Sequence, residues 1–136
     1  MCKTLIVEDS ASFRETLRGL LSSRFPYMVF EEAEGGEEAL NKLNGFLPDF
    51  VFMDVQLPGE NGLELTKKIK AWDSRPIVII LTAHDIPEYR QAAKENGANH
   101  FLSKNSSSAE EIWAVVDSSI SHLRLRGRAE IPDSCR

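Results

Sequence analysis

The sequence predicts an α/β protein with a doubly wound, five-stranded parallel sheet and helices on both faces. Two observations lead to this fold class. Short, nearly all-apolar runs occur five times, and each is followed by a stretch whose apolar residues recur at helical spacing. Strands that are apolar on both sides are typical of a parallel sheet that helices cover on either face.

The composition indicates one compact domain. The chain has 136 residues, of which 42% are hydrophobic and 27% charged, and its formal net charge of −5 argues against non-specific nucleic-acid binding. No apolar run approaches the roughly 20 residues that a membrane helix needs. The first apolar stretch is too short for a signal peptide, so we expect a cytoplasmic protein.

The first half of the chain supplies three strands and two helices. Strands are expected over 3–7, 27–33 and 50–54. Ser10 is a good N-cap for a first helix. The apolar residues that follow it share one helical face: Phe13, Leu17, Leu20 and Leu21. A second helix is expected over 37–43, and it should stop near Asn44-Gly45.

The second half continues the alternation. A helix over 62–72 precedes the most strand-like segment, 76–82. A helix over 87–96 closed by Gly97, a short strand over 100–103 and a final helix over 106–123 complete the pattern. We assign residues 1–124 to the domain, and 125–136 to a mobile tail or truncated linker. Cys2 and Cys135 lack metal-site spacing; two separate thiols are favoured over a terminal disulfide.

Five polar residues stand at or just after strand ends. Glu8 and Asp9 follow the first strand, and Asp54, Thr82 and Lys104 follow or end the third, fourth and fifth. Singly, each has an ordinary structural explanation, such as helix capping, macrodipole stabilisation or surface solvation. Together they lie at the carboxyl edge of the sheet, where open parallel sheets bind ligands. Three crowded acids repel one another unless a cation intervenes, and hard oxygen ligands favour Mg²⁺.

The motifs LIVEDS, FVFMDVQLPGENGLEL, VIILTAHD and FLSKN make the chain resemble the receiver domain of two-component response regulators, over about residues 3–123. The resemblance implies a flavodoxin-like fold with strand order 2-1-3-4-5. It implies that Asp54 accepts a phosphoryl group from a sensor histidine kinase or a histidine phosphotransfer protein. It further implies a Mg²⁺ site whose ligands are Glu8, Asp9, Asp54 and the backbone carbonyl of Gln56.

The same resemblance assigns the remaining roles. Thr82 and Lys104 would bind the phosphoryl group, and Thr82 and Phe101 would act as a switch. The switch would reshape the face made by the helix at 87–96, the fifth strand and the last helix, which would bind a downstream effector or a second copy. The chain would act as a signalling domain with self-catalysed phosphoryl transfer and slow aspartyl-phosphate hydrolysis, without direct nucleic-acid or membrane binding.

Two positions differ from the usual receiver pattern. Glu8 stands where an aspartate is more usual and adds one methylene. Asn105 stands where receivers usually carry proline after the lysine, often with a cis bond. Receivers attached to helix-turn-helix DNA-binding domains often lack that proline, and the stretch before it resembles that subgroup.

Three alternatives remain open. A haloacid-dehalogenase-like phosphatase also uses an aspartate nucleophile, but it needs a second acid two residues later, where this chain has Gln56. A flavin- or nucleotide-binding protein needs a glycine-rich loop after the first strand, and EDSASF has none. A receiver-like module that docks partners without being phosphorylated is the third alternative.

Overall fold

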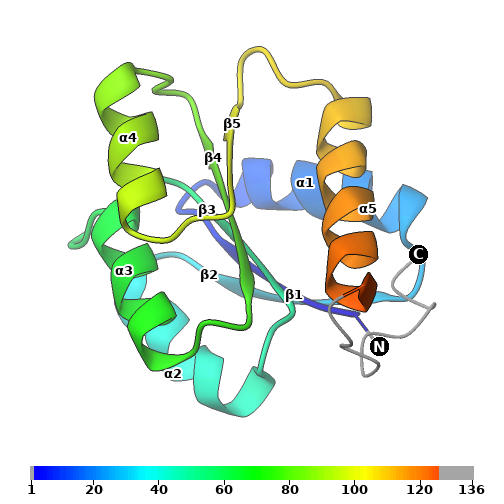
Figure 1. Cartoon of the computed structure of the whole chain (residues 1–136), viewed down its shortest axis with the longest axis horizontal. Helices are drawn as coiled ribbons and strands as arrows, with labels where there is room; N and C mark the ends of the chain where they lie inside the picture. Colours follow the sequence, from blue (N-terminus) through cyan, green and yellow to red (C-terminus); the bar gives the residue numbers. More distant parts are fainter. Residues whose placement is uncertain (1, 126–136) are drawn as a thin grey trace.

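The computed structural model describes residues 2–125 and shows a five-stranded parallel sheet in the order β2-β1-β3-β4-β5, as predicted (Figure 1). The strands are β1 (Cys2–Val7), β2 (Met28–Ala33), β3 (Phe50–Met53), β4 (Ile77–Thr82) and β5 (His100–Ser103). The helices are α1 (Ala11–Arg24), α2 (Gly36–Phe46), α3 (Gly62–Trp72), α4 (Pro87–Glu95) and α5 (Ala109–Leu125). Among these described residues, no helix is both long and apolar enough to cross a membrane.

Helices cover both faces of the sheet. Helices α1 and α5 lie on one face and α2, α3 and α4 on the other (Figure 1). Successive strand residues alternate between the two apolar clusters, so Phe50 and Phe52 pack under α1 and α5 while Val51 and Met53 pack under the opposite helices. All four residues of β3 and all six of β4 are buried, which explains why these strands read as continuous apolar runs.

Two helix boundaries differ from the sequence prediction by three residues, and the other differences are of one or two residues. Helix α2 continues through Gly45 to Phe46, its last residue. The C-cap residue is Leu47, whose backbone is left-handed with φ of 51°. The Leu47 N–H still reaches the Leu43 carbonyl at 2.9 Å, so the last turn is closed without a glycine. Helix α5 begins three residues later than expected, because the Ser108 hydroxyl accepts the N–H of Glu111 at 3.2 Å and caps it.

The state of Cys2 differs from the sequence prediction. The expectation of two separate thiols is wrong for Cys2, which is fully buried and disulfide-bonded. Cysteine spacing along a chain says nothing about how distant segments approach one another, so the sequence could not decide this. Cys135 and the segment 126–136 of the predicted tail lie outside the described residues.

Gly62 fixes the start of α3 against the end of β3. Its N–H donates to the Val55 carbonyl at 2.7 Å, and a Cβ atom at this position would overlap the carbonyl oxygen of Asp54. The close approach leaves room only for hydrogen. Gly19, in the middle of α1, has nothing within 4 Å of the place where a Cβ would stand.

We therefore predict that Gly62→Ala lowers the free energy of unfolding by about 2 kcal/mol or more, because packed backbone must move. Gly19→Ala is the matched control, and it should raise that free energy by roughly 0.5–1 kcal/mol through helix propensity. Urea denaturation of both variants measures the two changes. A loss below about 0.5 kcal/mol for Gly62→Ala would contradict the close packing described here.

Candidate functional site

The carboxyl edge of the sheet brings together the polar residues that follow β1, β3 and β5. Val7 of β1 is paired with Met53 of β3, so Glu8 and Asp54 leave their strands at the same level. The Asp54 N–H donates to the Val7 carbonyl at 3.1 Å, which extends the ladder by one residue. Lys104 is held in the same way, because its N–H donates to the Thr82 carbonyl at 2.8 Å. Strand pairing therefore fixes where Glu8, Asp54 and Lys104 stand along the strand direction.

Three acids form a compact cluster at this edge. Glu8, Asp9 and Asp54 each offer a carboxylate oxygen, and these oxygens all lie within 4.8 Å of one another. Glu8 and Asp54 are only 3% and 8% exposed, whereas Asp9 is exposed to solvent. Buried carboxylates at this separation repel strongly unless a cation or a proton compensates them.

Lys104 supplies the compensating charge. Its ammonium donates to Glu8 Oε1 and, at 3.1 Å, to Asp54 Oδ2. The other oxygen of Asp54 accepts the Val55 N–H at 2.7 Å, so both oxygens of this acid are held. The Lys104 side chain is 16% exposed, which places the ion pairs in partly desolvated surroundings.

The same crowding shifts two pKa values. Burial raises the pKa of Glu8, and the neighbouring Asp9 and Asp54 raise it further, while Lys104 and the Ser10 N–H act in the opposite direction. Burial by itself lowers the pKa of Lys104, but Glu8 and Asp54 together outweigh it, and the net pKa of Lys104 is raised. A cationic lysine is thus the favoured state beside these acids.

Thr82 ends β4 beside this cluster and is fully buried. Its hydroxyl oxygen accepts the N–H of His84 at 3.2 Å, which ties it to the loop between β4 and α4. A hydroxyl that accepts one hydrogen bond still has its own hydrogen to donate. The side chain of Gln56 is exposed on the loop after β3, and Gly59 in that loop has a left-handed φ of 79°.

The peptide bond between Lys104 and Asn105 is trans. No peptide bond between residues 2 and 125 is cis, so Lys104 and Asn105 are joined by an ordinary trans bond. The Asn105 amide donates to the Ala83 carbonyl at 3.3 Å, and its backbone N–H donates to the Ser103 hydroxyl at 3.2 Å. The contact with Ala83 links the loop after β5 to the loop after β4.

Phe101, the predicted switch residue, lies half-buried on β5 against the apolar cluster under α2, α3 and α4. The guanidinium of Arg90 lies 4.8 Å from its ring centroid. Arg90 in turn donates to both oxygens of Asp85, at 2.6 and 3.0 Å. The hydrogen bonds and charge of Asp85 raise the pKa of Arg90, and Arg90 lowers that of Asp85.

Two site residues were missed by the sequence prediction, Phe13 and Arg14 in the first turn of α1. The ring centroid of Phe13 lies 4.2 Å from the Lys104 nitrogen. Arg14 donates to the Glu8 carbonyl at 2.5 Å and to Glu32 at 2.8 Å, and so ties the loop after β1 to β2. The apolar spacing assigned Phe13 to the core. The one available signal was that both residues lie within five positions of the acidic pair.

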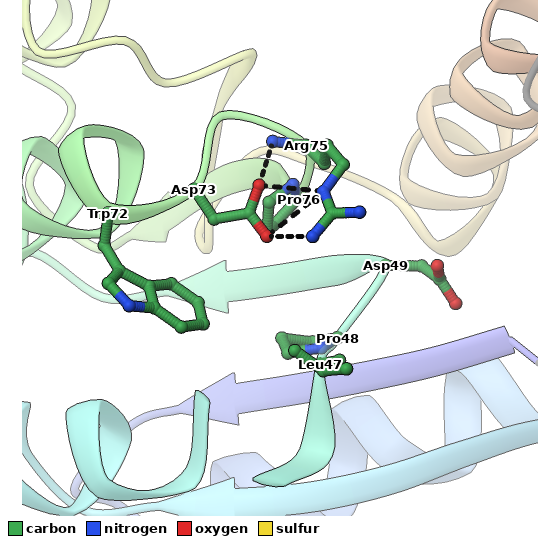
Figure 2. Close-up of a pocket in the computed structure, with 7 residues that line it drawn as sticks. All are labelled: Leu47, Pro48, Asp49, Trp72, Asp73, Arg75 and Pro76. Atoms are coloured by element: carbon green, nitrogen blue, oxygen red, sulfur yellow. Dashed lines mark hydrogen bonds and ion pairs between the residues drawn. The ribbon is translucent and has the colours of Figure 1, made fainter. Parts of the chain in front are cut away.

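A separate pocket of about 160 Å³ lies at the opposite edge of the sheet, between the loops that precede β3 and β4 (Figure 2). Asp73 and Arg75 face each other there in a paired ion contact, with hydrogen bonds of 3.0 to 3.3 Å. Trp72 and Leu47 line it and are half-exposed. This pocket shares no residue with the acidic cluster.

Comparison with known proteins agrees with this geometry. The family described as "Response regulator receiver domain" matches residues 4–117. The chemotaxis protein CheY of Halobacterium salinarum is 31% identical over 115 residues, which are 85% of this chain and 94% of that protein. The transcriptional regulatory protein YdfI of Bacillus subtilis is 36% identical over 120 residues, 88% of this chain and 55% of YdfI.

Several longer proteins match through only part of their length. A protein-glutamate methylesterase/protein-glutamine glutaminase of Bacillus licheniformis is 32% identical over 96% of this chain, which spans 37% of that protein. The chain thus spans about half or less of the first curated relatives it matches.

Solved structures show the same fold. A LuxR-family response regulator from Aurantimonas is 30% identical, with a TM-score of 0.82 over 90% of this chain and 86% of the other. A CheY-like receiver domain from Methanospirillum hungatei has a TM-score of 0.84 at 19% identity, over 93% and 98% of the two chains. With the family match and the arrangement of strands, acids and lysine, the chain belongs to the response regulator receiver domain family.

Proposed function

We propose that this chain accepts a phosphoryl group on Asp54 from a sensor histidine kinase or a histidine phosphotransfer protein, and that the modified form changes its contacts with other proteins. The observation that carries the proposal is the setting of Asp54. This carboxylate is 8% exposed and is held between the Lys104 ammonium and the Val55 N–H, at the edge where ligands of parallel sheets bind.

The reaction needs little from the protein beyond positioning and charge. A carboxylate oxygen of Asp54 forms a bond to phosphorus while the bond from phosphorus to the donor's imidazole nitrogen breaks, and the imidazole leaves with the electron pair. The product is an acyl phosphate. Phosphoryl transfer depends mainly on alignment and on neutralising the charge of the transferred oxygens. Lys104 is within hydrogen-bond distance of Asp54 and is suited to neutralise one of those oxygens.

Mg²⁺ fits the donor set. Glu8, Asp9 and Asp54 offer carboxylate oxygens within 4.8 Å of one another, and such hard oxygens are the ligands that Mg²⁺ takes. We propose these three acids and the backbone carbonyl of Gln56 as its ligands. When bound, the ion would neutralise phosphoryl oxygens. It would also relieve the repulsion among the acids, which adds to the effect of burial in raising the pKa of Glu8.

Thr82 and Phe101 form the proposed switch. The Thr82 hydroxyl can keep the His84 N–H and donate its own hydrogen to a phosphoryl oxygen, which would pull on the loop between β4 and α4. Asp85 in that loop is paired with Arg90, and Arg90 lies over the ring of Phe101. A shift of the loop would therefore be felt by Phe101 and by the face made by α4, β5 and α5. We propose this face as the binding surface for an effector or a second copy.

The remaining assignments follow from this role. We propose a cytoplasmic signalling domain whose only chemistry is its own phosphorylation and slow hydrolysis. The competing proposal is a module that docks partners without phosphorylation. A small phosphodonor, which needs no kinase, distinguishes the two.

We predict that acetyl phosphate labels the protein in the presence of Mg²⁺ and that Asp54→Ala abolishes the label, because the nucleophile is gone. Chelation of Mg²⁺ should abolish it too. Asp117→Ala, which removes a partly exposed aspartate on α5, serves as the control and should label normally. Labelling is measured by intact-protein mass spectrometry, and far-UV circular dichroism checks the fold. A fully labelled Asp54→Ala protein would refute the assignment, and an unlabelled wild type would favour the docking module.

A second prediction concerns pH. Because the fold raises the pKa of Glu8 above its ordinary value of 4.5, the stability contributed by its protonated form is present below that value. This contribution is lost as pH rises through the raised pKa. A glutamine side chain cannot ionise, so Glu8→Gln should resemble the wild type near pH 4.5 and be the more stable protein near pH 8, without metal.

Urea denaturation in a chelating buffer at several pH values measures this difference. Glu15→Gln, at an exposed position on α1, is the control and should show no such trend. If Glu8→Gln were less stable than the wild type at pH 8, the ion pair with Lys104 would outweigh the cost of the buried charge.

A third prediction separates the switch from the chemistry. Thr82→Ala should still be labelled on Asp54, because Lys104 and the acids remain. It should lose the phosphorylation-dependent change in amide hydrogen exchange over residues 83–103, since the loop is no longer pulled. Thr82→Ser keeps the hydroxyl and should keep the change. Hydrogen-exchange mass spectrometry makes the comparison, and an unaltered response in Thr82→Ala would show that the signal leaves by another route.

A further inference from the structure

The Lys104 ammonium has a third neighbour besides the two acids. Its nitrogen lies 4.2 Å from the ring centroid of Phe13, in the first turn of α1. We infer that Phe13 is a positioning residue, whose ring holds the Lys104 ammonium beside Asp54 during phosphorylation. This inference rests on the proposed function. It concerns a side chain that the acidic motif does not include.

The backbone that carries the ring is held by a helix cap. The Phe13 N–H donates to the Ser10 hydroxyl at 3.2 Å, and this N-cap fixes the first turn of α1 directly after the acidic pair. Phe13 is half-buried and packs on the apolar cluster under α1 and α5. The segment 8–13 thus contains the two acids, the helix cap and the aromatic ring.

The contact has the geometry of a cation–π interaction. Attraction between a lysine ammonium and an aromatic face acts within about 6 Å of the centroid, and it strengthens when water is excluded. The Lys104 side chain is only 16% exposed. Beside it lies a mostly apolar cavity of about 180 Å³, whose walls include Phe13, Leu17, Leu81 and Ile112. Without the ring, Lys104 would have room to turn away from Asp54.

A bound metal ion would weaken the contacts of Lys104 with the acids, but it would not weaken the contact with the Phe13 ring. Carboxylates that bind a metal have less charge left for Lys104, so the lysine would lose part of its hold on Glu8 and Asp54. An aromatic face offers a hard cation no oxygen, so the contact with Phe13 is compatible with a metal at the acids. Phe13 therefore holds the ammonium in place in the very state in which phosphorylation occurs.

The competing explanation is that Phe13 only fills the core. Phe13→Leu distinguishes the two, because it keeps an apolar side chain and removes the ring. Phe13→Tyr keeps the ring. Phe46→Leu is the matched control, since Phe46 is also half-buried but packs on the other face of the sheet.

The first measurement is structural. In protein with ¹³C-labelled lysine, the ε-methylene protons of Lys104 should show an upfield ring-current shift, with and without Mg²⁺. Phe13→Leu should lose this shift, Phe13→Tyr should retain it and Phe46→Leu should leave it unchanged. Absence of the shift in the Mg²⁺-loaded wild type would overturn the inference.

The second measurement is the rate of Mg²⁺-dependent labelling by acetyl phosphate. Phe13→Leu should slow it by roughly two- to five-fold, the size expected of a partly exposed cation–π contact. Phe13→Tyr should restore most of the rate. In a Lys104→Met background, Phe13→Leu should cause no further loss, because the ring acts through the ammonium.

A wild-type rate in Phe13→Leu, or an equal slowing with and without Lys104, would overturn the inference and leave Phe13 a core residue. Failure of the wild type itself to label would instead refute the proposed function. The ring-current shift would then still decide whether Phe13 holds Lys104.

Discussion

The contact of Lys104 with Glu8 and Asp54 is the interaction on which the rest of this structure depends. Two nearly buried carboxylates and a third at the surface converge at one edge of the sheet, and their mutual repulsion must be balanced. The Lys104 ammonium offsets part of this repulsion, and burial together with the neighbouring Asp9 and Asp54 still raises the pKa of Glu8. Such a cluster of acids favours an added cation.

The parallel sheet brings Glu8, Asp54 and Lys104 to one edge. Adjacent strands end at the same level, so Glu8 and Asp54 meet without any special loop, and Lys104 arrives from the edge strand. Loops then refine the arrangement. Gly62 allows α3 to approach the Asp54 backbone, and Ser10 starts α1 where Phe13 meets Lys104. The paired strands thus bring the site residues close together, and the contacts of Gly62 and Ser10 position the helices beside them.

Much of this was predictable, because strand periodicity and strand ends are local signals. The bounds of α3 and the grouping of the acids with Lys104 agree with these signals, and the strand order agrees with what the resemblance to receiver domains implied. The end of α2 was not predictable, since exposed Leu47 takes the left-handed conformation that Gly45 was expected to supply. Three serines precede α5, and only the folded chain selects Ser108 as the cap. The contact of Phe13 with Lys104 joins residues 13 and 104, so no local pattern carries it.

In the proposed function, the carboxylate of Asp54 is a nucleophile toward phosphorus. The most direct test is chemical mapping of the modified residue. The protein is treated with a small phosphodonor and Mg²⁺, the acyl phosphate is reduced with borohydride, and the peptides are analysed by tandem mass spectrometry. We expect homoserine at position 54. Homoserine at another aspartate, or no reduced product under conditions where an established receiver domain is labelled, would contradict it.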